Sequence, residues 1–130
     1  MLREIFIIII IIVSVVGVNF FIPNYLDNSS KEFVSKLDEL STKLKEKENI
    51  DYDEIKKELD NLEEKWYEVE SVWMLIILHS DLDLVDKAFK ELQATLEIKN
   101  AEQSYVNAKR LQFLIESVTK KDLFELKNIF

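Results

Sequence analysis

The pattern of apolar and polar residues divides the chain into an uncharged N-terminal segment and a long region of amphipathic stretches. No charged residue occurs between Ile5 and Leu26, and the run IFIIIIIIVSVVGVNFFI fills positions 5–22. As a helix this run would span about 27 Å, close to the roughly 30 Å of a bilayer's hydrocarbon core. The pattern predicts a transmembrane anchor over residues 5–26, after an N-terminal tail of residues 1–4. Pro23 is expected to end or kink the span, because the residue before a proline avoids helical geometry.

A cleaved signal peptide is the rival interpretation of this segment. Its apolar run is longer than the usual length of about 7–15 residues, and the Val-Val-Gly triplet at 15–17 is only a weak cleavage motif. We therefore expect an uncleaved anchor. Positive charges nearly balance across it, with Arg3 before the span and Lys31 and Lys36 after it. The signal-like layout favours a cytoplasmic N-terminus, a cell-membrane location and an extracytoplasmic C-terminal domain.

Beyond residue 26 the apolar residues recur at the three- and four-residue steps of amphipathic helices. The sequence therefore predicts an all-α fold, in which a bundle domain over residues 27–130 consists of two αα-hairpins and a short C-terminal helix. The first hairpin carries Phe33, Leu37, Leu40 and Leu44, then Ile55, Leu59, Leu62, Trp66, Val69, Trp73 and Ile76. The second carries Leu82, Val85, Phe89, Leu92 and Leu96, then Ala101, Tyr105, Ala108, Leu111, Leu114, Ile115 and Val118.

Polar residues at capping-box spacing predict where these helices begin. The pairs are Ser29 with Glu32, Asp51 with Glu54, Asn100 with Gln103, and Thr119 with Asp122. The apolar positions of the two hairpins also align without a gap at an offset of 52 residues. This alignment fits an internal repeat, but any two heptad hairpins with short loops would align in the same way.

Composition excludes several classes of function. The only glycine is Gly17 and the only proline is Pro23, so the glycine-containing loops of phosphate-binding and α/β-hydrolase sites are missing. The net charge of −8 disfavours nucleic acid, because phosphate binding needs clustered Lys and Arg. The absence of cysteine excludes disulfides, thiolate metal sites and a cysteine nucleophile.

The stretch HSDLDLVD holds the only histidine, in the pattern His79-x-Asp81-x-Asp83-x-x-Asp86. An EF-hand would need a glycine and a late glutamate, and a zinc site would need more nitrogen or sulfur ligands. We predict a helix corner instead. His79 would lie in the last turn of one helix, and Asp81 and Asp83 in the first turn of the next, with Ser80 or Asp81 as the cap. A weak cation site and catalysis remain the alternatives, and no catalytic, metal or cofactor site is predicted.

Apolar residues at two places are candidates for contact surfaces or a pocket. Large aromatics at heptad positions are usually core, but Trp66 and Trp73 share a face and could also stack a ligand. The stretch from Val72 to Leu78 has no polar face at all. The candidates are Trp66, Trp73, Leu75, Ile76 and His79, together with Leu123, Phe124 and Phe130 of the C-terminal tail.

The uncharged N-terminus, the two tryptophans, the stretch WMLIILHSDLD and the ending LKNIF resemble a family of small bacterial proteins classed only as a domain of unknown function. Trp73, Leu75, Ile76 and His79 correspond in type to its pattern W-x-x-L-I-x-x-H, although Leu75 lies one position away from it. The resemblance covers nearly the whole chain. It implies one membrane helix, a helical domain and no established activity, and it gives His79 more weight than a bare corner residue.

We therefore expect a non-enzymatic, single-pass membrane protein whose helical domain binds another protein or a second copy of itself. The stretch from Val72 to Leu78 and the tail from Leu123 to Phe130 are the expected contact surfaces, and membrane lipid surrounds residues 5–26. The alternative is an extracytoplasmic ligand-sensing bundle with a pocket near Trp66, Trp73 and His79, working with a signalling partner. An enzyme ranks third.

Overall fold

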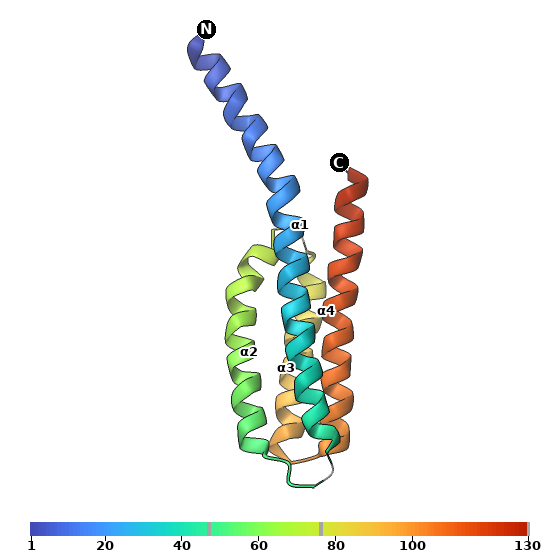
Figure 1. Ribbon diagram of the computed structural model, residues 1–130. Coiled ribbons are helices and arrows are strands. Elements are labelled where there is room, and N and C mark those ends of the chain that lie inside the picture. Colours follow the sequence, from blue (N-terminus) through green and yellow to red (C-terminus); the bar gives the residue numbers. More distant parts are fainter. Residues whose placement is uncertain (47, 76, 130) are drawn as a thin grey trace.

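The helices of the computed structural model stand side by side as an antiparallel bundle (Figure 1). The structure describes residues 1–46, 48–75 and 77–129, except for the side chains of residues 19, 22, 23 and 122–129. The helices are α1 (Leu2–Lys45), α2 (Tyr52–Trp73), α3 (His79–Glu97) and α4 (Ala101–Ile129). No strand occurs in these residues. The predicted all-α class and the two antiparallel hairpins are confirmed.

A single helix, α1, carries both the N-terminal apolar run and the first apolar stripe of the bundle. The expected helix end at Pro23 is therefore wrong, because proline's fixed φ is compatible with a helix that loses one hydrogen bond. The expected start at Ser29 is also wrong. Its Oγ donates to the carbonyl of Tyr25 at 2.6 Å, inside the helix. Leu26, at the end of the predicted anchor segment, is fully buried in the bundle core.

The N-terminal part of α1 projects past the other helices (Figure 1). Its large apolar side chains from Ile5 to Val18 are 42–66% exposed, so the other residues that the structure describes do not cover them. Among the described residues, no helix combines the length and apolar content required of a membrane span.

Most of the predicted heptad residues that the structure describes form the core of the bundle, whereas Val69, Ala101, Tyr105 and Leu114 are half-buried. Each helix turns one apolar stripe inward, α1 packs against α2 and α4, and α3 packs against the same two helices. The fully buried side chains include Leu37, Leu59, Trp66, Trp73, Leu82, Phe89, Leu92, Leu96 and Leu111. The period of apolar residues was therefore sufficient to identify the packed faces.

Two of the predicted helix starts are confirmed by their cap hydrogen bonds. The Asp51 carboxylate accepts from the backbone N–H of Glu54 at 3.1 Å. The Asn100 side-chain oxygen accepts from the N–H of Gln103, also at 3.1 Å. Each bond satisfies an amide that would otherwise lack a partner at the first turn of α2 or α4.

The chain reverses direction without glycine by placing other residues in the left-handed region. Asn49 lies in the α1–α2 connection with φ 58°, and Lys99 follows α3 with φ 55°. The N–H of Asn100 donates to the carbonyl of Thr95 at 3.0 Å, and that of Lys99 to Leu96 at 3.1 Å. This is the Schellman arrangement of a helix C-terminus, with lysine where glycine is usual.

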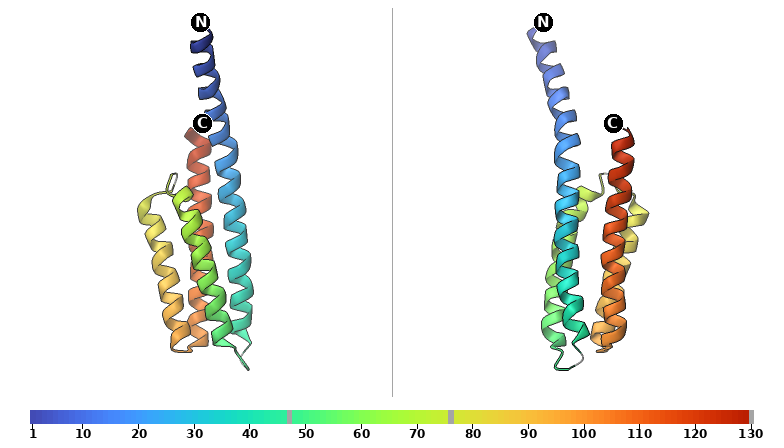
Figure 2. Two further views of the ribbon diagram at one scale, coloured as in Figure 1. Left: turned by 90° about the vertical axis from the view of Figure 1, so that its left-hand side faces the viewer. Right: turned by 45° about the vertical axis from the view of Figure 1, so that its right-hand side comes forward.

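The helix α4 continues to Ile129, so the separate short C-terminal helix expected after Thr119 is absent. The Thr119 hydroxyl donates to the carbonyl of Ile115 at 2.6 Å, within α4, instead of capping a new helix. The end of α4, the α2–α3 connection and the projecting part of α1 all point to the same end of the molecule (Figure 2). The side chains of Leu123 and Phe124, and the whole of Phe130, lie outside the described residues.

Candidate functional site

The predicted corner between α2 and α3 exists, but His79 occupies a different position in it. His79 is the first residue of α3, where the helix dipole is positive, and does not belong to the last turn of α2. Leu78 is the N-cap, and neither Ser80 nor Asp81 supplies a cap hydrogen bond. The physical reason is burial: α2 ends at Trp73, and the chain then turns so that Ile77, only 3% exposed, returns to the core.

The three aspartates after His79 have three different partners. Asp83 pairs with His79, with 3.7 Å between Oδ1 and Nε2, and both side chains are exposed. Asp81 faces Lys121 of α4 at 3.9 Å. Asp86 accepts a hydrogen bond from Trp66 of α2. The carboxylates therefore diverge, and the described residues contain no group of three metal-ligating side chains.

Four buried aromatic residues form a cluster beneath the corner, which we call the aromatic cluster: Phe33, Trp66, Trp73 and Phe89. The two indoles meet edge to face, with 5.0 Å between ring centroids and 87° between planes. Phe33 of α1 meets both indoles edge-on, and Phe89 of α3 lies 6.1 Å from Trp66. Both tryptophans are 0% exposed, so the structure places them in the core that their heptad spacing predicts.

Each buried indole N–H has an acceptor on another helix. Trp73 Nε1 donates to the Ser29 hydroxyl of α1 at 3.1 Å, and Trp66 Nε1 donates to Asp86 Oδ1 of α3 at 2.6 Å. The sequence analysis missed both partners, because Ser29 resembled a helix cap and Asp86 belonged to the suspected ligand pattern. A buried indole N–H requires an acceptor, and that requirement is the signal that could have prompted a search for one.

Glu70 lies beside this arrangement and is only half-buried. Partial burial, a hydrogen bond with Asp86 and the negative charges of Asp86 and Asp83 together raise the pKa of the Glu70 carboxyl to about 7, against an opposing effect of His79. Glu70 and Asp86 thus form a carboxyl pair, and Asp86 also accepts the hydrogen bond from the Trp66 indole. No sequence pattern indicates this pair, because its members lie on two different helices.

The apolar stretch from Val72 to Leu78 contains both buried and exposed side chains. Trp73 and Ile77 are buried, whereas Met74 is 49%, Leu75 74% and Leu78 57% exposed. We call the last three residues the exposed corner. Of the sequence candidates here, Leu75 is thus a surface residue, and Ile76 lies outside the described residues.

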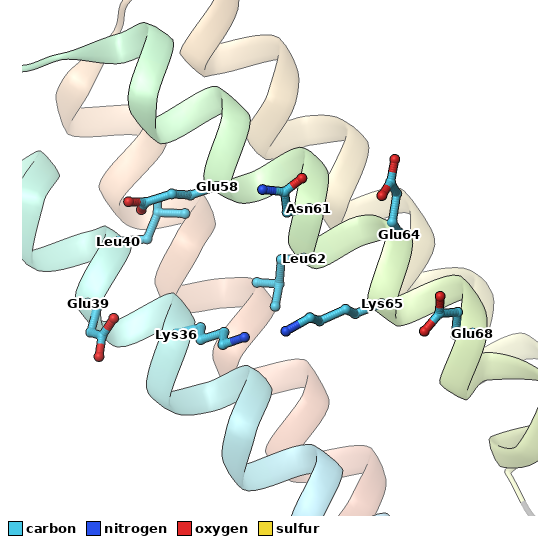
Figure 3. A pocket seen from close by; sticks show the side chains of 9 residues that line it. All are labelled: Lys36, Glu39, Leu40, Glu58, Asn61, Leu62, Glu64, Lys65 and Glu68. Atoms are coloured by element: carbon cyan, nitrogen blue, oxygen red, sulfur yellow. The ribbon is translucent and has the colours of Figure 1, made fainter.

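A groove of about 540 Å³ runs between α1 and α2, and Figure 3 shows the amines of Lys36 and Lys65 pointing toward each other in it. Glu32 lies within 3.3 Å of the first amine and 3.6 Å of the second. The Lys36 amine lowers the pKa of Lys65 by hydrogen bonding and by charge repulsion. The other lining residues are Glu39, Leu40, Glu58, Asn61, Leu62, Glu64 and Glu68. Because four of them are glutamates, the groove does not form an anion site.

A family model described as a domain of unknown function (DUF4363) matches residues 20–129. The chain belongs to this family. The match covers the bundle and the end of the apolar run, which confirms the predicted likeness to a family without an assigned activity. Neither a curated protein nor a solved structure matches the chain.

Proposed function

We propose that this DUF4363 protein is a non-enzymatic interaction module that α1 anchors in a cell membrane, with the bundle on the extracytoplasmic side. The observation that carries the proposal is the exposure of the apolar side chains from Ile5 to Val18 in a helix that the bundle leaves uncovered. Contiguous exposed apolar surface of this kind belongs against lipid or another protein. The sequence run continues to Ile22, which brings its helical length to about 27 Å.

Protein binding is better supported for the bundle than ligand sensing. A ligand pocket at the tryptophans would need space beside them, yet Trp66 and Trp73 are 0% exposed and pack against each other. Three grooves beside α2 are lined by neither tryptophan. The indole N–H groups are already bonded to Ser29 and Asp86 and offer nothing to a ligand.

The outer face of α4 supplies a protein-contact surface of suitable chemistry. Val106 is 53% and Phe113 65% exposed, and their spacing of seven residues places them on one face. Arg110 lies between them on the same face and pairs with Glu91 at 3.3 Å. Exposed aromatic and arginine side chains together are typical of the residues that dominate binding energy at protein interfaces.

Photo-crosslinking in membranes of the native cell tests this proposal. A photoreactive amino acid replaces Phe113 in one variant and Tyr67, a 49% exposed residue of α2, in a matched control. The chain is expected in carbonate-washed membranes, and the Phe113 variant is expected to give a discrete adduct that the Tyr67 variant does not. An adduct of twice the chain's mass identifies a second copy as the partner. A chain absent from the membranes, or equal labelling from both positions, contradicts the proposal.

A further inference from the structure

The exposed corner lies at the end of the bundle from which the N-terminal part of α1 projects (Figures 1 and 2). We infer that Met74, Leu75 and Leu78 dip into the membrane surface and form a second, shallow contact with lipid. This inference rests on the proposed anchoring of α1. It assigns an occupant to an apolar surface that is exposed among the described residues.

The hydrogen bond between Trp73 and Ser29 shows how far the corner lies, along the axis of α1, from the proposed anchor. It places the end of α2 level with residue 29 of α1. Residue 29 follows residue 22, the last of the apolar run, by about 10 Å of helix. The exposed corner lies beyond Trp73 in the direction of that run. It is about one helical turn farther along, which is about 5 Å. Since the interfacial layer is roughly 5–7 Å thick on each side of the hydrocarbon core, the corner reaches the headgroup level.

The charges around the corner favour an apolar contact over an electrostatic one. Asp27 pairs with Lys31 at 3.0 Å on α1, and Asp81 faces Lys121 at 3.9 Å. The amines of Lys31 and Lys121 thus lie beside carboxylates, which weakens their attraction for anionic headgroups. The contact is expected in vesicles of zwitterionic phosphatidylcholine and is expected to change little with salt.

The opposite end of the bundle provides a matched comparison. Ile98, at the α3–α4 connection, is 71% exposed, against 74% for Leu75, and both are branched aliphatic residues. A general affinity of exposed aliphatic side chains for lipid would affect both positions equally. A lipid contact that depends on where the anchor holds the bundle would affect Leu75 alone.

The test uses single cysteines, because the native chain has none. Full-length Leu75→Cys, Ile98→Cys and Val13→Cys are each labelled with an environment-sensitive fluorophore. They are reconstituted into phosphatidylcholine vesicles with and without a nitroxide-labelled lipid. The label at position 75 is expected to emit at shorter wavelength and to lose intensity to the nitroxide, as is the label at position 13. The label at position 98 is expected to remain quenchable by aqueous iodide only.

The three reporters separate failure of this inference from failure of the anchor. If position 13 is quenched by the nitroxide while position 75 behaves like position 98, the anchor stands and the corner contact is wrong. If position 13 is not quenched, the anchoring itself is wrong and the inference falls with it. A label at position 75 that neither quencher reaches indicates a protein contact, which also overturns the lipid assignment. Labelled Leu78→Cys must agree with Leu75→Cys, which guards against a local effect of one substitution.

Discussion

Removal of the Ser29 hydroxyl tests the link between α1 and α2 that sets the height of the corner. Trp73 is 0% exposed, and its Nε1–H donates to the Ser29 hydroxyl at 3.1 Å. In Ser29→Ala this buried donor loses its acceptor, which costs about 1–3 kcal/mol. Alanine's higher helix propensity returns up to about 0.5 kcal/mol. We therefore expect the free energy of unfolding to fall by about 0.5–3 kcal/mol.

The same substitution is expected to be harmless once the indole is gone. In a Trp73→Phe background no N–H is left without a partner, so Ser29→Ala should be neutral or slightly stabilising. The coupling energy between the two substitutions is then about 1–3 kcal/mol. The other tryptophan, Trp66, remains in every variant as a fluorescent reporter of the core.

Urea unfolding of the full chain in mild detergent, followed by Trp66 fluorescence and helical circular dichroism, measures this coupling. Thr42→Ala is the control, because the Thr42 hydroxyl is exposed and donates at 2.9 Å to the Asp38 carbonyl of its own helix. A cycle of Thr42→Ala with Trp73→Phe should show no coupling. A coupling near zero for Ser29, or the same value for Thr42, would refute the proposed link between α1 and α2.

Three further predictions concern the corner and the turns. The native state holds a proton on Glu70 between its usual pKa of 4.5 and its raised value of about 7, so stability should fall as the pH rises through that window. In Glu70→Gln the change in unfolding free energy across this pH window should shrink by about 1 kcal/mol, allowing for solvent screening. An unchanged pH profile of urea unfolding contradicts the raised pKa of Glu70. Lys99→Gly should raise the free energy of unfolding by up to about 1 kcal/mol, because glycine tolerates φ 55° without steric cost, whereas a loss would contradict the left-handed turn. His79→Gln should change the free energy of unfolding by less than about 0.5 kcal/mol, since the His79 side chain is 73% exposed. If divalent metal raises the melting temperature of the native chain but not of this variant, the corner assignment is wrong.

The sequence predicted the core of the bundle well, because burial follows the helical period directly. Leu59, Trp66 and Leu92 lie on predicted apolar faces and are fully buried. The starts at Asp51 and Asn100 were also predictable, since each supplies a side-chain oxygen three residues before the amide that it caps.

The helix boundaries at Ser29, Thr119 and His79 were not predictable in the same way. Serine and threonine hydroxyls bond equally well to a carbonyl four residues back, so the same residue fits a cap or a helix interior. Ser29 makes this internal bond, and its second partner, Trp73, is 44 residues away. The position of His79 depends on where α2 ends, which is decided by the burial of Ile77.

The candidate site could be predicted only as a set of residues, not as an arrangement. The spacing of His79, Asp81, Asp83 and Asp86 allows them to face one ligand or several partners, and only the packing of α2 and α4 against α3 decides this. Packing sends Asp86 to Trp66 and Asp81 toward Lys121. The pairing of Glu70 with Asp86 likewise joins positions that have no common pattern in the sequence.

Carbonate extraction followed by membrane flotation tests the central claim, that α1 anchors the bundle. Arginine replaces Ile9 and Ile12, which are 52% and 56% exposed in the middle of the apolar run. Each arginine near the centre of a membrane helix costs about 2.5–3.5 kcal/mol of insertion. The control places arginine at Leu84 and Ile98, which are 50% and 71% exposed on the bundle. The native chain and the control should float with the membranes, whereas the Ile9/Ile12 variant should be released. Release of the native chain, or flotation of all three proteins, would contradict the anchor.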